Sequence, residues 1–320
     1  MPPFHDDHLA WRHPLVRDLA WLLQAPDLLT LERPGRPAPA ELGLADNEAL
    51  ADYLGRLEAA PERLERYLGG TLQGRMGHYH ERLWQFLLDT APGTRLLTHN
   101  LAILRDRRTL GELDMLYAVA ADPTPVHFEV AIKYYLGLPE GPGDESDQAR
   151  WIGPGGLDSL AIKRRHLETH QLPLAHTQAA REALAERLGA PVPHLRQRLA
   201  MPGVLFYPWH APLPSPRAAN TDHHRGRWLH WRDWPQLRAT YPRTASGVWL
   251  CKPHWLALPH PQRLPPLEVL EHRLRAHFAS GGAPVQLALR HSKDTAAAWQ
   301  RVFLVDDHWP RQMPLPPAET

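Results

Sequence analysis

The chain has 320 residues, which is enough for one large domain or two ordinary ones. Apolar residues make up 43% of it and charged residues 22%, so a buried core is expected and disorder throughout the chain is not. The 36 basic and 35 acidic residues nearly cancel, so any surface for nucleic acid has to be local.

The single cysteine, Cys251, excludes an internal disulfide and a zinc site built from several thiolates. We expect this thiol to be buried in an apolar strand, and a reducing compartment fits it best. The first residues lack the basic start and the apolar run of a signal peptide. No stretch approaches the roughly 18 apolar residues that span a bilayer, so the sequence predicts a cytoplasmic protein with no membrane partner.

The first part of the chain has the apolar spacing of helices. Helices are predicted over residues 10–24 and 46–69, and Pro61 is expected to start a new helix inside the second range. Residues 1–72 are therefore interpreted as a helical N-terminal lead-in. A further helix is predicted over 74–89, with its apolar residues on one stripe.

Strands are predicted next, over residues 96–104, 109–119 and 126–136, with Asp122–Pro125 acting as a breaker before the third. Residues 139–156 are rich in glycine, proline and acids, which is typical of a loop. Helices are expected over 157–171, with Asp158 as the cap, and over 176–189. Together, residues 73–200 form one predicted core.

From about residue 201 the composition shifts toward aromatic residues. Strands are predicted at 204–207, 228–231, 248–251, 285–290 and 302–305, with one helix at 267–279. The tryptophans here are expected to fill a core rather than to stack on bases. Residues 201–320 are interpreted as an aromatic-rich α+β C-terminal region.

Acidic residues alternate with apolar ones in the second and third predicted strands. Glu112 and Asp114 are expected to share one face of the second strand, because strand side chains alternate. Glu129 and Lys133 are expected to share a face of the third strand. Glu81 lies off the apolar stripe of the preceding helix, from which it could reach one end of the sheet.

This order of a helix glutamate, a Gly111–Asp114 hairpin and a strand ending in glutamate and lysine resembles the PD-(D/E)XK phosphodiesterase superfamily. The resemblance implies an α+β protein with a nuclease core of the restriction-endonuclease type, in which helices flank a mixed sheet. It also implies that Asp114, Glu129 and Glu81 bind Mg²⁺ or Mn²⁺, a hard cation that prefers oxygen ligands. Lys133 would then help the attacking water.

One departure from the superfamily pattern concerns its acid-x-lysine motif. If Lys133 is the lysine, Ala131 occupies the place of the acid, and Glu129 lies four residues away, about 13 Å on a regular strand. A bulge could shorten that gap, or Glu112 could supply the missing ligand. A third reading is a degenerate site that binds without cutting.

Over most of its length the chain also resembles an uncharacterised bacterial family, domain of unknown function 1853. The segments that carry this likeness are Glu81–Leu87, Gly111–Asp114, Val126–Leu136 and Trp151–Pro154. This family resemblance brings no activity of its own, so the nuclease expectation depends on the superfamily.

Basic side chains near the predicted core are candidates for nucleic-acid contact. Lys163 and Arg164 lie on the helix after the third strand, and Arg107 and Arg108 lie in the turn before the second. The sequence thus predicts a magnesium-dependent phosphodiesterase on nucleic acid, with DNA favoured over RNA. A module that binds nucleic acid without cutting stays open, as does a protein-partner role, so whether the chain is an enzyme is not decided.

Overall fold

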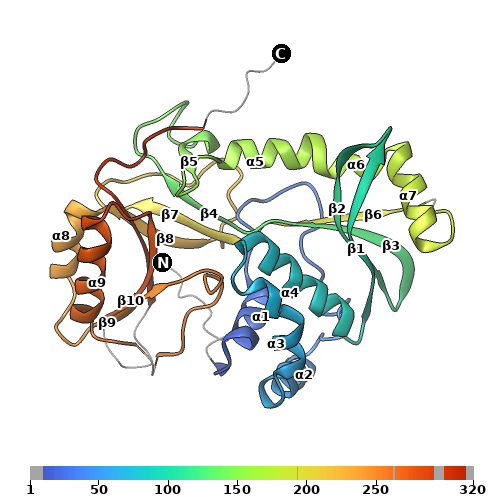
Figure 1. Ribbon diagram of the computed structural model, residues 1–320, viewed down its shortest axis with the longest axis horizontal. Helices are drawn as coiled ribbons and strands as arrows, with labels where there is room; N and C mark the ends of the chain where they lie inside the picture. Colours follow the sequence, from blue (N-terminus) through green and yellow to red (C-terminus); the bar gives the residue numbers. More distant parts are fainter. Residues whose placement is uncertain (1–9, 193, 262–263, 292–298, 315–320) are drawn as a thin grey trace. The chain divides into compact units, whose positions relative to one another are not determined.

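The computed structural model describes residues 10–192, 194–261, 264–291 and 299–314, so the N-terminal residues 1–9 lie outside it (Figure 1). The chain divides into two compact units. Unit 1 comprises Met1–Trp21, Lys133–Lys163 and Gly203–Thr320, and unit 2 comprises Leu22–Ile132 and Arg164–Pro202. Because the units are interleaved along the chain, they do not coincide with the three consecutive segments that composition suggested.

The predicted N-terminal helices are confirmed. They are α1 (Pro14–Gln24), α2 (Asn47–Ala59), α3 (Glu62–Leu68) and α4 (Met76–Thr90), with a short 3-10 turn, η2 (Gly69–Thr71), after α3. Asp46 caps α2 by accepting the Ala49 N–H at 2.7 Å. Pro61 starts α3, where its missing N–H costs no hydrogen bond.

The sheet of unit 2 has four strands in the order β1-β2-β3-β6. They are β1 (Thr94–Arg105), β2 (Arg108–Val119), β3 (Asp122–Val130) and β6 (Arg196–Ala200). The first three are antiparallel neighbours, and β6 pairs parallel to β3. The prediction that Asp122–Pro125 breaks the strand is wrong. This segment begins β3, and its first residue, Asp122, pairs with Val119 of β2.

The long third strand predicted over 126–136 is two strands. Its first part is β3, which pairs with β6 up to Val130, and its second part is β4 (Lys133–Gly137) of unit 1, which pairs with β7 (Gly203–Pro208). The break lies opposite the segment that joins β6 to β7, where Pro202 has no N–H to donate to a neighbouring strand. Gly203 is required after it, because a Cβ there would collide with the carbonyl oxygen of Lys133.

One helical run follows the loop after β4. It consists of α5 (Leu160–His166), the π-turn η4 (Leu167–Gln171) and α6 (Leu172–Leu174), and then α7 (Gln178–Leu188) ends at Gly189 in the left-handed conformation. The hydroxyl of Ser159 accepts the Ile162 N–H at 3.3 Å, so Ser159 rather than Asp158 caps α5. In unit 2, α4 and α7 both pack against β1.

Unit 1 is built on a seven-stranded mixed sheet in the order β5-β4-β7-β8-β11-β10-β9. Its remaining elements are β5 (Trp151–Ile152), β8 (His224–His230), β9 (Ser246–Leu250), β10 (Val285–Arg290), β11 (Trp299–Val305), α8 (Trp234–Ala239), α9 (Leu267–Ala279), η3 (Gln148–Arg150) and η5 (Trp231–Asp233). Leucines of α8 and α9 pack with β8, β10 and β11 in one core. Both sheets are mixed and flanked by helices, so the α+β class is confirmed.

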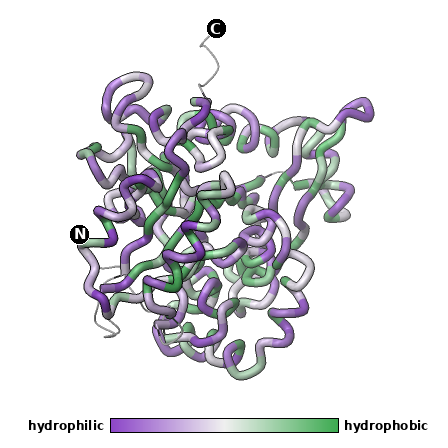
Figure 2. Tube along the Cα trace, turned by 60° about the vertical axis from the view of Figure 1, so that its left-hand side comes forward, coloured by the Kyte–Doolittle hydropathy of each residue, from purple (hydrophilic) through white to green (hydrophobic). Residues whose placement is uncertain are grey.

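Hydrophobic residues gather along the strands, whereas the loops are mostly hydrophilic (Figure 2). Trp228, Trp234 and Trp255 are buried, as expected for core residues. Cys251 is a correction, because it is exposed just beyond β9 rather than buried inside a strand. Among the described helices, none is long and apolar enough to cross a membrane.

Candidate functional site

Two carboxyl groups meet where β2 and β3 stop pairing. Met115 pairs with Phe128, so Asp114 and Glu129 are the next residues beyond the last pair of this ladder. The Val130 N–H, which has no β2 partner there, donates to Oδ2 of Asp114 at 3.0 Å. The Asp114 N–H points to Oε1 of Glu129 at 3.4 Å. Beyond the end of the ladder, the two carboxyl groups thus accept backbone N–H groups that would otherwise lack a strand partner.

This acidic pair is buried, with Glu129 at 0% and Asp114 at 8% exposure. Burial first, and then the charge of Glu129, raise the pKa of Asp114 to about 9, and the charge of Glu81 adds to this while the Val130 N–H opposes it. Asp114 therefore keeps its proton near neutral pH. A cation could take the place of that proton.

Glu129 is oriented by two donors from different elements. Nε2 of His127 lies 2.6 Å from its Oε1, and Nε2 of Gln171 donates to its Oε2 at 3.0 Å. Gln171 ends the π-turn between α5 and α6. Such turns are rare and frequent at functional sites, and this one places an amide donor against the buried carboxylate.

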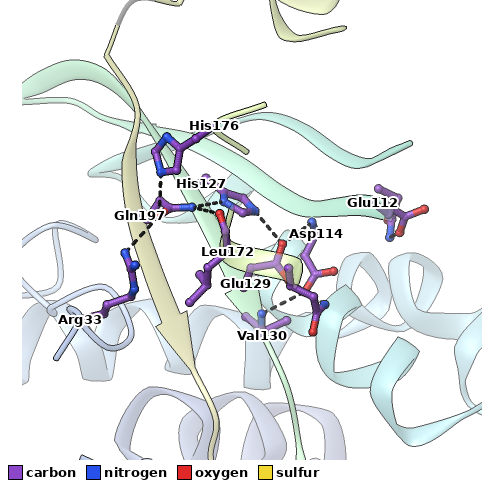
Figure 3. Close-up of polar contacts among 11 residues, drawn as sticks. Arg33, Glu112, Asp114, His127, Glu129, Val130, Leu172, His176 and Gln197 are labelled. Atoms are coloured by element: carbon purple, nitrogen blue, oxygen red, sulfur yellow. Dashed lines mark hydrogen bonds and ion pairs between the residues drawn. The ribbon is translucent and has the colours of Figure 1, made fainter. Parts of the chain in front are cut away.

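A chain of polar contacts fixes His127 in turn (Figure 3). Nε2 of Gln197, on β6, donates to the Leu172 carbonyl at 2.7 Å, and its Oε1 accepts from Arg33 at 3.2 Å. Because arginine only donates and a carbonyl only accepts, the orientation of this amide is determined. Its second N–H must then point to Nδ1 of His127 at 3.2 Å, which leaves the ring proton on Nε2 to be donated to Glu129.

Glu81 lies on α4, with a quarter of its side chain exposed and the His78 ring 3.9 Å away. It is close enough to Asp114 for its charge to raise the pKa of that carboxyl. The three carboxylates that the superfamily resemblance assigns to metal are therefore electrostatically coupled within unit 2.

Glu112, the alternative ligand, lies apart from the acidic pair in Figure 3. Its side chain is exposed and accepts a hydrogen bond from the Asn100 amide at 2.8 Å. Asp114, two residues further along the same strand, is buried instead. The two acids predicted to share a face thus have different surroundings.

Lys133 is on β4 in unit 1, not on the strand that carries Glu129. Its Nζ lies 2.5 Å from Oδ2 of Asp158, an oxygen that also accepts from the Tyr135 hydroxyl at 3.0 Å. The carboxyl charge and deep burial keep the pKa of Tyr135 well above its usual range, with burial as the larger cause. The structure thus groups Lys133 with Asp158 and Tyr135.

The residues predicted to contact nucleic acid occupy two places. Lys163 and Arg164 are partly exposed on α5, and Arg164 pairs with Glu168 one turn later at 2.9 Å. Arg107 and Arg108 are exposed at the tip of the β1–β2 hairpin.

Within the described ranges, no group of three or more His, Cys, Asp or Glu side chains is arranged to hold a metal ion. Asp114 and Glu129 still fit a Mg²⁺ centre in part, because Mg²⁺ is commonly bound by one or two carboxylates, with waters and substrate phosphate completing its shell. Three polar partners were missed from the sequence: His127, Gln171 and Gln197. Only His127 carried a signal, because it lies two residues before Glu129 on an alternating strand.

Fold and site together define an α+β protein with a buried pair of carboxyl groups at the end of a mixed sheet. The chain belongs to the family described as domain of unknown function DUF1853, whose model matches residues 17–305. That range contains the acidic pair and all of its polar partners. No curated protein and no solved structure matches the chain.

Proposed function

We propose that this protein is a Mg²⁺- or Mn²⁺-dependent phosphodiesterase that acts on nucleic acid, with DNA favoured over RNA. The observation that carries the proposal is the buried pair Asp114–Glu129, which retains a proton and is held by oriented donors. Burying two acids costs stability, and such pairs concentrate at functional sites.

The geometry favours a particular alignment with the superfamily motif. Glu129, which lies beside Asp114, takes the place of the acid in acid-x-lysine, and Ala131 then stands where the lysine is expected. Asp114 and Glu129 would hold the metal, and Glu81 would be a third or water-mediated ligand. Lys133 remains a proposed aid to the attacking water, supplied from the next strand, β4.

Each part of the chain has a limited task in this proposal. A divalent cation, when bound, lowers the pKa of a water and neutralises charge on the phosphate. Gln171 and His127 keep the Glu129 carboxylate in one orientation, as partners of metal ligands commonly do. Asp114 gives up the proton that it retains without a cation.

The test is a calorimetric titration of Mn²⁺ into the wild type, Asp114→Asn and Glu112→Gln. We expect saturable binding that Asp114→Asn abolishes and Glu112→Gln leaves unchanged, because Glu112 lies apart from the pair and bonds Asn100. A cleavage assay on supercoiled and linear DNA follows with the same variants. Binding that survives Asp114→Asn would remove the basis of the proposal.

A module that binds nucleic acid without cutting is the second candidate. It is favoured by Ala131 at the lysine position and by the engagement of Lys133 with Asp158. It predicts DNA binding that is salt-dependent and unaffected by Asp114→Asn. Loss of phosphodiester bonds in the presence of Mg²⁺ would exclude it.

A further inference from the structure

The tip of the β1–β2 hairpin exposes two large aliphatic side chains. Leu104 is 56% and Leu110 is 47% exposed, and both belong to the small set of large apolar residues in the described chain that lie largely in solvent. We call residues 104–110 the hairpin tip. Neither leucine belongs to the buried cluster beneath the hairpin, so both side chains are available to a binding partner.

The hairpin tip extends past its supporting sheet, whereas its base is anchored. Strand β3 pairs with β2 only between Met115 and Val119, so the tip lies beyond the third strand. Just below it, Ile103 and Leu113 are fully buried in a cluster with residues of α6 and α7. In Figure 1 the two strands run side by side next to these helices.

The turn itself is tight and unusual. Arg105 pairs with Arg108, and the two residues between them have positive φ angles, 50° at Asp106 and 64° at Arg107. Two-residue turns of this kind match the twist of a hairpin, but glycine, asparagine or aspartate usually occupies them. An arginine in the left-handed region is uncommon. The chain thus accepts backbone strain to present an arginine here.

The hairpin tip is basic on a chain that is nearly neutral. It holds Arg105, Arg107 and Arg108 against one acid, Asp106. The contact of Arg105 with Asp106 is long, 3.9 Å, and both side chains are mostly exposed, so it neutralises little. Arginines that flank aliphatic side chains on a projecting ribbon fit the minor groove of a DNA duplex, where arginine meets a negative potential and leucine can enter between base steps.

We propose that the hairpin tip enters the minor groove of duplex DNA, with its arginines at the phosphates and groove walls and Leu104 and Leu110 inserted between base steps. This inference names the form of nucleic acid engaged by the proposed phosphodiesterase, and it depends on that function. Arg108 and Asp114 are six residue steps apart on β2, about 20 Å at 3.3 Å per step. On a duplex that runs along β2, the hairpin tip would therefore contact DNA about six base pairs from the acidic pair.

Binding to a 20-base-pair duplex in EDTA tests the arginines, because no cleavage is possible without metal. Arg107→Ala/Arg108→Ala should weaken binding about tenfold or more and lower the slope of log K against log salt by about two. The matched control is Arg63→Ala/Arg66→Ala on α3, which removes the same charge from exposed positions. An equal loss in the control would reduce the effect to overall charge and overturn the inference.

The leucines are tested by fluorescence of 2-aminopurine placed in the duplex. Wild-type protein should raise the fluorescence of an unstacked base, and Leu104→Ser/Leu110→Ser should abolish the rise while leaving the salt slope unchanged. A lower salt slope in the Leu104→Ser/Leu110→Ser variant, or no fluorescence change with the wild type, would overturn the proposal that the leucines enter between base steps. So would binding of wild type to phosphatidylserine vesicles but not to duplex.

The same variants separate this inference from the proposed function. Leu104→Ser/Leu110→Ser should bind Mn²⁺ as the wild type does. If the wild type binds no Mn²⁺ but the tip variants still lose duplex binding, the metal centre fails and the tip stands as a DNA contact. If Mn²⁺ binding and cleavage are normal in both tip variants, the tip inference fails and the metal centre stands.

Discussion

Nε2 of His127 lies 2.6 Å from Oε1 of Glu129, and both side chains are fully buried. The neighbouring strand orients this contact, because the amide of Gln197 on β6 leaves only Nδ1 of His127 as an acceptor. The Glu129 carboxylate therefore receives its shortest hydrogen bond from a ring that is itself held in place. This dependence makes His127 the most informative position in the site to change.

His127→Ala should lower the free energy of unfolding by about 1–3 kcal/mol, because Glu129 then lacks its shortest donor. If the acidic pair binds metal, the Mn²⁺ affinity should also fall about 10- to 100-fold. Urea denaturation and calorimetry measure the two effects. His176→Ala is the control, because His176 is exposed and bonds the other end of the Gln197 amide. A larger loss in the control would contradict the prediction.

The stability of the metal-free protein should depend on pH through Asp114. Its pKa is about 9 in the folded state against an ordinary value of 3.8 for an exposed aspartate, so the native state binds one proton more between these limits. Stability from this carboxyl is thus present at low pH and is lost as pH rises, at most by about 1.4 kcal/mol per pH unit. Asp114→Asn should flatten that decline between pH 5 and pH 9 in EDTA. An unchanged slope would show that Asp114 is ionised throughout.

His80 should produce the opposite dependence on the acid side. It is fully buried on α4, neither ring nitrogen has a hydrogen-bond partner among the described residues, and burial lowers its pKa to about 3. The unfolded state protonates near pH 6.5 and the folded state does not, so stability falls as pH drops from 6.5 toward 3. His80→Leu should remove this loss, which the two pKa values put at about 3 kcal/mol at pH 4. Parallel melting curves at pH 4 and pH 7 provide the measurement, and equal shifts at both pH values would refute it.

Lys133→Met should separate catalysis from metal binding. Its ion pair with Asp158 is partly exposed, so the change should cost less than about 1 kcal/mol of stability. If Lys133 aids the attacking water, turnover should fall at least about 100-fold while Mn²⁺ affinity stays unchanged. Lys163→Met is the control and should raise the apparent Kd for DNA instead. Turnover that is normal in Lys133→Met would remove this residue from the mechanism.

Local periodicity was sufficient for most elements of this fold. The helix over 267–279 was predicted with the bounds that α9 has, and acids within apolar strands pointed to Asp114 and Glu129. Both predictions use the spacing of apolar residues close together in the sequence, about 3.6 residues for a helix face and two residues for a strand face.

Long-range pairing was not visible in the sequence. The run 126–136 keeps one strand-like pattern, in which His127, Glu129 and Lys133 alternate with apolar residues, so nothing in it marks the change of partner from β6 to β7 between Val130 and Lys133. Strand β6 is short and begins Arg196-Gln197-Arg198, a polar start without the alternation of a buried strand. The Gln171 contact depends on a π-turn, which shifts the register of a helix in a way that 3.6-residue spacing does not predict.

The interleaving of the two units sets an order for folding during synthesis. Strand β3 ends at Val130, but its parallel neighbour β6 begins only at Arg196, after β4 and the α5–α7 helices have been made. At typical elongation rates the ribosome needs several seconds for that interval. Until then β3 lacks its parallel neighbour, and His127 lacks the Gln197 amide that orients its ring toward Glu129. The acidic centre can therefore be completed only late, so an incomplete nascent chain would lack it.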